Sequence, residues 1–92
     1  MPPFLADFTP ILEKVAPLRG TADFDDVYVE VNDWVSSART QSQAHATCQR
    51  IATMCHPRAW GDRASSSAEM QSWAAFLGEL KALSLQTAKR LE

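Results

Sequence analysis

Four residues whose side chains bind metals or act as nucleophiles lie close together in the sequence: His45, Cys48, Cys55 and His56. On a helix, His45 and Cys48 would be one turn apart on the same face, where they could share a metal ion. Cys55 follows Cys48 by seven residues. That spacing is about 10 Å along a straight helix axis, too far for one zinc ion with bonds of about 2.0 to 2.3 Å. We therefore expect no bound metal or cofactor, with a His45/Cys48 metal site as an alternative.

The same spacing argues against a disulfide and against nucleophilic catalysis. A disulfide needs Cα atoms about 4.4 to 6.8 Å apart, so Cys48 and Cys55 cannot be bridged within one unbroken helix. Cys55 and His56 are neighbours, and neighbouring side chains on a helix point about 100° apart, so adjacency does not give the imidazole access to the thiol. The chain has three glycines, no phosphate-binding loop and no nucleophile elbow. We expect no catalytic residues and a protein that is not an enzyme.

The segment between residues 56 and 63 carries the most distinctive local chemistry, because a large aromatic side chain lies between arginines. A structural role, with Trp60 folded back as a lid over the helix ends, is the slightly favoured interpretation. Tryptophan and arginine also dominate the energetics of protein interfaces. If the chain binds a partner protein, we predict Trp60 as the anchor, Arg58 and Arg63 as charged residues at the rim, and Trp34 as a contact at an exposed helix edge.

Helices must position these residues, because small and apolar side chains recur every three or four positions between residues 24 and 55. The polar stretch 36–43 has no glycine or proline to end a helix, so one long helix is the first expectation and a break near residues 36–40 is the alternative. Valines alternate over residues 27–31, as in a strand, but the helical spacing continues beyond them and favours a helix. The residues of this stripe are Phe24, Tyr28, Val31, Val35, Ala38, Cys48, Ile51 and Cys55.

Two further helices flank this region. In the first, Pro10 would remove a backbone hydrogen bond, so we expect the helix to start near Thr9, with its hydroxyl as the N-cap, and to end at Pro17 and Gly20. Asp23 is the expected N-cap of the long helix over residues 24–55.

The last helix is expected to start at a capping box, Ser66-Ser67-Ala68-Glu69, and to run to about Arg90. Gly78 inside this helix predicts a close contact with another helix, since glycine costs about 1 kcal/mol relative to alanine at such a position.

Size and composition indicate one domain. The chain has 92 residues, of which 46% are hydrophobic and 22% charged, the composition of a globular protein. We predict a single all-α domain over residues 1–92, a bundle of three helices, or of four if the long helix is broken. We expect the terminal Leu91-Glu92 to come from an expression-vector junction and leave it out of functional argument.

Charge is unevenly distributed along the chain. Residues 1–35 hold seven acids and two bases, a net charge of −5, whereas residues 36–92 hold seven bases and four acids, a net charge of +3. We expect the two halves to pair internally rather than to present opposite faces to a partner. Nucleic-acid binding by a helical regulator is an alternative to protein binding. Against it, the pI is about 5.6, and Glu69 and Glu79 precede the bases Lys81, Lys89 and Arg90 in the last helix.

These observations together predict a small cytoplasmic regulator, adaptor or chaperone-like protein. The start of the chain lacks a secretory signal, and no segment has the roughly 20 apolar residues needed to span a bilayer. We expect a non-catalytic protein-protein interaction module that binds through apolar helix faces. Its partner would be another protein or a second copy of itself, as in a homodimer, rather than nucleic acid or a membrane.

Overall fold

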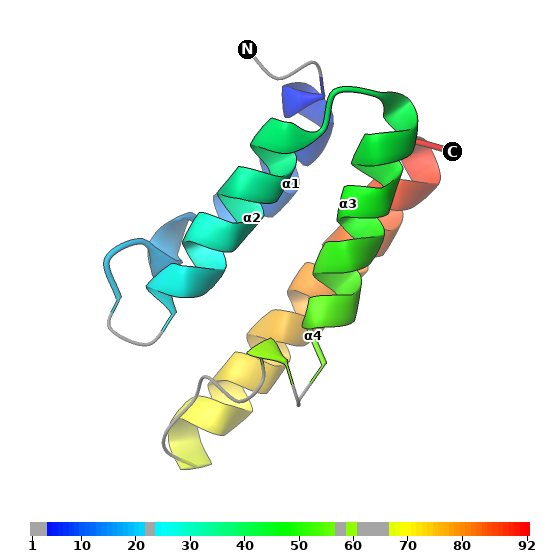
Figure 1. Ribbon diagram of the computed structural model, residues 1–92. Coiled ribbons are helices and arrows are strands. Elements are labelled where there is room, and N and C mark those ends of the chain that lie inside the picture. Colours follow the sequence, from blue (N-terminus) through cyan, green and yellow to red (C-terminus); the bar gives the residue numbers. More distant parts are fainter. Residues whose placement is uncertain (1–3, 22–23, 57–58, 61–66) are drawn as a thin grey trace.

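The computed structural model describes residues 4–21, 24–56, 59–60 and 67–92, and these residues contain four α-helices and no strand. The helices run alternately down and up, so that each packs against its neighbour in sequence and α1 packs against α4 (Figure 1). The predicted all-α class is confirmed, in its four-helix form. The elements are α1 (Leu5–Val15), a 3-10 turn η1 (Ala16–Leu18), α2 (Asp25–Ser37), α3 (Gln41–Met54) and α4 (Ser67–Arg90).

The core follows the spacing of buried residues along each helix. Buried positions alternate by three and four residues, the pattern that keeps one seam of a helix facing its neighbours in a bundle. On α4 the seam continues to Leu91, one residue past the helix end. Its two polar residues, Ser84 and Thr87, are fully buried. The seam residues are Phe8, Ile11, Val15 and Leu18 at the first helix, Ala44, Cys48 and Ile51 on α3, and Trp73, Leu77, Leu80, Ser84, Thr87 and Leu91 at the last helix.

A break separates α2 from α3, so the expectation of one long helix is wrong and its alternative is confirmed. Ala38 leaves the helical conformation with a ψ of 115°, and Thr40 is extended with a ψ of 161°. The Thr40 hydroxyl accepts a hydrogen bond from the Gln43 N–H at 3.1 Å, while the Gln43 side chain accepts one from the Arg39 N–H at 2.9 Å. These reciprocal bonds start a new helix without glycine or proline.

The first helix begins at Leu5, four residues before the expected start, and Thr9 and Pro10 lie inside it. The predicted N-cap at Thr9 is therefore wrong. Fully burying a phenylalanine contributes about 1.5 to 3 kcal/mol, a gain comparable with the cost of a proline inside a helix. Phe8 has no exposed surface, and its burial requires this early turn. The predicted end is confirmed, because Pro17 lies in η1 and Gly20 has a φ of +77°.

The second helix spans the alternating valines, so the strand alternative for residues 27–31 is excluded. Asp25 and Asp26 lie in its first turn, where the positive end of the helix dipole favours acids. The Asp25 carboxylate also accepts a hydrogen bond from the Gly20 N–H at 2.7 Å. The predicted cap Asp23 lies outside the described residues.

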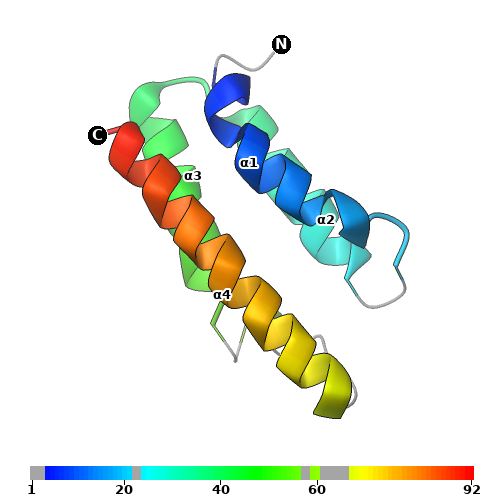
Figure 2. The same ribbon diagram turned by 180° about the vertical axis from the view of Figure 1, so that it is seen from behind.

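The third and fourth helices make the most extensive contact in the bundle (Figure 2). Several buried side chains of α3 and of the second half of α4 are small, among them Ala44, Cys48 and Ala88. Ser84 and Thr87 are buried there, and each hydroxyl donates to the carbonyl four residues earlier, at 2.8 and 2.9 Å. Gly78, by contrast, is exposed, and a Cβ added to it would meet nothing within 4 Å. The predicted close contact at Gly78 is therefore wrong. Ser66, the predicted cap of α4, lies outside the described residues.

Candidate functional site: a groove between α2 and α3

The structure places Trp60 in the core. Its side chain has no exposed surface, and its indole N–H donates a hydrogen bond to Oε2 of Glu30 at 2.8 Å. Its carbonyl accepts a hydrogen bond from the Trp73 indole at 2.6 Å. This arrangement matches the lid interpretation and leaves no Trp60 surface for a partner in this conformation. Arg58 and Arg63, the predicted rim charges, lie outside the described residues.

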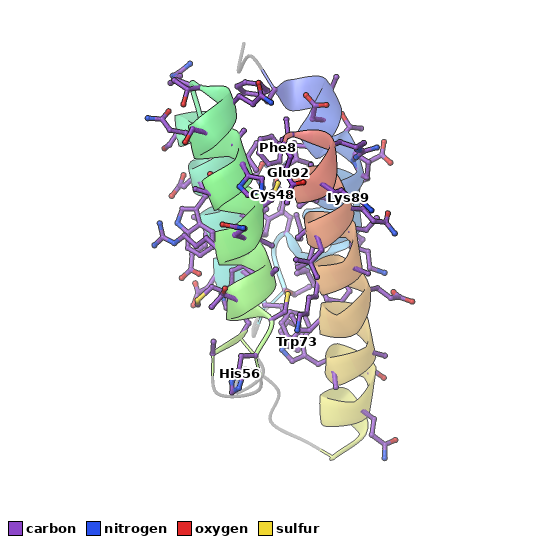
Figure 3. The ribbon with its side chains drawn as sticks, turned by 90° about the vertical axis from the view of Figure 1, so that its right-hand side faces the viewer. Phe8, Cys48, His56, Trp73, Lys89 and Glu92 are labelled. Atoms are coloured by element: carbon purple, nitrogen blue, oxygen red, sulfur yellow. The ribbon has the colours of Figure 1, made fainter. Side chains whose placement is uncertain are left out.

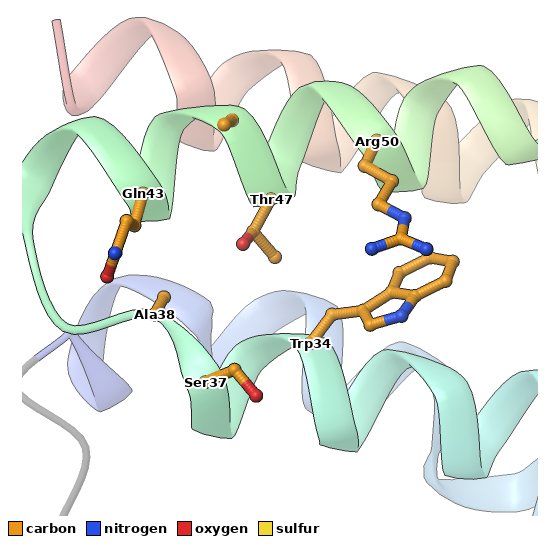
Figure 4. A pocket seen from close by; sticks show the side chains of 7 residues that line it. Trp34, Ser37, Ala38, Gln43, Thr47 and Arg50 are labelled. Atoms are coloured by element: carbon orange, nitrogen blue, oxygen red, sulfur yellow. The ribbon is translucent and has the colours of Figure 1, made fainter.

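Trp34, the fourth predicted site residue, is half-buried and stacks on Trp60 with ring centroids 5.6 Å apart. It also lines a groove of about 320 Å³ between α2 and α3 (Figure 4). Pockets that hold small ligands have volumes of roughly 300 to 1,000 Å³. The groove is at the lower end of this range, so it has room for a small ligand or for a few side chains. The residues that line the groove are Trp34, Ser37 and Ala38 from the α2 side and Gln43, Ala46, Thr47 and Arg50 from α3.

Arg50 lies over the Trp34 ring, with its guanidinium carbon 4.0 Å from the ring centroid (Figure 4). This cation–π contact holds the exposed guanidinium group at the groove. Within the described part of the chain, no carboxylate lies within 4.0 Å of it to form an ion pair. Arg50 was not among the predicted site residues. The sequence did contain a feature that sets Arg50 apart. It is the single residue of α3 that belongs to the types Asp, Glu, Lys and Arg.

A second hollow of about 550 Å³ lies between α3 and α4. Lys81 and Leu85 of α4 line it, and 49% of the Leu85 side chain is exposed. Cys55 lines it as well and donates a hydrogen bond to the Ile51 carbonyl at 3.3 Å. Burial raises the pKa of the Cys55 thiol to about 11, so the thiol stays protonated at neutral pH and is a poor nucleophile.

Cys48 is buried in the same hydrophobic core as Phe8, whereas His56 is exposed just past the end of α3 (Figure 3). Both cysteines are free. His45 lies near the chain end, its Nε2 atom 3.6 Å from Oε1 of Glu92. In residues 4–21, 24–56, 59–60 and 67–92, no three His, Cys, Asp or Glu side chains meet in a group that could hold a metal ion.

Between described residues, the ion pair that joins the two halves runs opposite to the expected sense. The ion pair between Lys14 and Glu79 joins α1 to α4, but it joins a base of the acidic half to an acid of the basic half. Where both partners are described residues, no acid of residues 1–35 forms an ion pair with a base of residues 36–92.

No protein-family model, no curated protein and no solved structure matches this chain. Of the helices described, none is long and apolar enough to cross a membrane.

Proposed function

We propose that this chain is a non-catalytic protein-interaction module of the cytoplasm and that the groove between α2 and α3 holds a segment of a partner protein. The observation that carries the proposal is the stacked pair of Trp34 and Arg50 at the wall of this groove. Tryptophan and arginine are the residue types most enriched among interface residues that contribute strongly to binding.

The rest of the groove supports this assignment. The central part of a protein interface is depleted of charged residues, and the other lining residues are alanines and uncharged polar residues. Of the described residues that line the groove, none titrates near neutral pH, so these residues offer no general base or activated nucleophile. Two free cysteines suit the reducing cytosol.

Site-specific photocrosslinking in the native host tests the proposal. A benzophenone amino acid replaces Ala46, which lines the groove and is exposed, and in a matched control it replaces Ala82, which is exposed on α4. We expect a discrete adduct with another protein at position 46 that is missing at position 82. Equal adducts at both positions, or none at position 46, would contradict the groove as the binding site. Light scattering of the purified protein distinguishes a partner protein from a second copy of the chain.

A further inference from the structure

We infer that the partner segment held between α2 and α3 is acidic and that a carboxylate side chain of that segment binds the Arg50 guanidinium group. This inference rests on the proposed function and specifies the chemistry of the partner.

The first argument is the state of the guanidinium group. Its stack on Trp34 restrains the side chain, but within the described residues Arg50 forms no ion pair and donates no hydrogen bond. A guanidinium group carries five N–H donors in a planar fork that matches the two oxygens of a carboxylate. Since the stack already limits the rotamers of Arg50, binding a carboxylate costs less conformational entropy than it would for a free side chain.

The second argument is the charge of α3, the helix that carries Arg50; the acids near the groove, Glu30 and Asp33, belong to α2. Residues 34–61 contain no aspartate or glutamate, although the whole chain has a net charge of −2. Arg39 is exposed at the connection between α2 and α3, and Lys81 lines the hollow on the other side of α3. A segment lying along α3 therefore meets Arg50, Arg39 before the helix start and Lys81 beside it, and no acid from this helix. Charge complementarity of this kind selects an acidic partner and accelerates association.

A phosphate backbone is a poorer fit than an acidic peptide. Binding of single-stranded nucleic acid depends on bases that stack on aromatic rings and on a groove with several bases to follow the phosphates. The Trp34 ring already contacts Arg50 and Trp60, and Arg50 is the only base among the described residues that line this groove. A single restrained guanidinium group suits one carboxylate of a peptide better than a chain of phosphates.

The test starts from a random peptide display library selected on the purified full-length protein. The strongest binder is synthesised together with an analogue in which Asp and Glu are replaced by Asn and Gln. Fluorescence anisotropy then gives the Kd of both peptides for wild type, for Arg50→Gln and for the matched control Arg39→Gln. Circular dichroism verifies that each variant is folded, and Ala46→Phe serves as a variant with a filled groove.

We expect the selected peptides to be rich in Asp or Glu and the neutral analogue to bind wild type at least about tenfold more weakly, as for a lost hydrogen bond between charged groups. The Arg50→Gln variant should bind the acidic peptide and its neutral analogue with equal Kd. The Arg39→Gln variant should keep most of the difference in Kd between the two peptides. Binders that Ala46→Phe abolishes but that tolerate neutralisation would overturn the acidic partner and keep the groove. No binders, or binders insensitive to Ala46→Phe, would overturn both proposals. Displacement of the peptide by oligothymidylate at an equal concentration would overturn the acidic partner in favour of nucleic acid.

Discussion

Trp34 and Trp60 are in contact, yet their surroundings give them different roles. Trp60 is enclosed and has partners for both its indole N–H and its carbonyl. Trp34 is half-buried, and the Arg50 guanidinium group stacks on its ring at the edge of a groove. The residue type alone made both of them candidates for an interface. Burial assigns Trp60 to the core and leaves Trp34 at the groove that we propose as the binding site.

Replacing Trp60 should therefore reduce stability. We expect Trp60→Ala to lower the free energy of unfolding by about 3 to 5 kcal/mol, as for other large-to-small changes in a core. Trp60→Phe should cost about 1 to 3 kcal/mol, because the Glu30 carboxylate loses a hydrogen-bond donor. Urea denaturation measures both values. Trp34→Ala is the control and should cost less, since part of Trp34 is already in contact with water. An unchanged stability of Trp60→Ala would contradict the core position.

The thiol of Cys48 should make stability depend on alkaline pH. Burial raises its pKa from 9.0 to about 11, although the positive charge of Arg90 acts in the opposite direction. Between about pH 9 and 11 the unfolded chain therefore binds fewer protons than the folded one, so stability falls as the pH rises. Below about pH 8 this group has no such effect. Urea denaturation across this range should give a smaller fall for Cys48→Ala than for wild type.

A matched core variant separates this effect from simple loss of packing. Ile51→Val removes one methylene group from the same buried side of α3 and should lower stability at every pH without changing the alkaline fall. Equal alkaline slopes for wild type and Cys48→Ala would show that the thiol does not contribute to the pH dependence.

Among the helices, α3 has the most informative start, because its cap separates two helices that the apolar spacing alone would join. Thr40 and Gln43 have the residue types of a capping box, so this signal was present in the sequence. Its local hydrogen bonds compete with helix continuation through residues that carry no glycine or proline. The same break turns α3 back along α2 and creates the groove lined by Trp34 and Arg50.

Removing the cap should destabilise the start of α3. We expect Thr40→Ala to lower the free energy of unfolding by about 0.5 to 2 kcal/mol, because the Gln43 N–H loses its acceptor. Thr40→Ser keeps a hydroxyl and should cost much less. Thermal unfolding followed by circular dichroism measures both variants. Equal losses for the two substitutions would show that the hydroxyl does not cap the helix.

In α4, by contrast, Gly78 offers a stabilising substitution. The position is exposed and helical, and an added Cβ has free space. Gly78→Ala should raise the free energy of unfolding by about 0.5 to 1 kcal/mol, because alanine loses less backbone entropy in a helix. The reverse change at an exposed position of the same helix, Ala75→Gly, should lower it by a similar amount. A loss of stability in Gly78→Ala would indicate that this glycine has a close neighbour after all.

At the scale of the whole molecule, stacked aromatic rings gather around Trp73 at one end of the bundle, whereas the other end buries several alanines together with Phe8 and Leu91. Trp73 stacks on Phe24 and Phe76, with ring centroids 4.1 and 5.1 Å apart, and its indole bonds to the Trp60 carbonyl. The opposite end buries Ala38, Ala44 and Ala88, together with Leu91, whose carbonyl accepts a hydrogen bond from Gln41 at 2.6 Å. One continuous core joins the two ends.

Because the core is continuous, we expect the two ends to unfold together. Tryptophan fluorescence reports on the aromatic end and far-UV circular dichroism on all four helices. A small single domain unfolds in one cooperative step, so both signals should give the same midpoint in urea. A fluorescence midpoint at lower urea would show that the aromatic end opens before the rest of the bundle.

The helices follow from residue spacing, because a side chain that must reach the core recurs with the period of the helix. The stripe in residues 24–55 predicted helices and the all-α class, and Pro17 and Gly20 predicted the end of the first helix. The predicted start of that helix at Thr9 was wrong, because the free energy gained by burying Phe8 outweighs the free-energy cost of Pro10 inside the helix.

The groove and the fate of each tryptophan depended on tertiary structure. Arg50 meets Trp34 because the chain reverses at Thr40, and these residues are 16 positions apart in the sequence. Spacing along one helix carries no information about contacts between helices. Residue types could therefore suggest Trp34 and Trp60 as candidates for binding, but only packing decided that Trp60 is enclosed and that Arg50 is exposed beside Trp34.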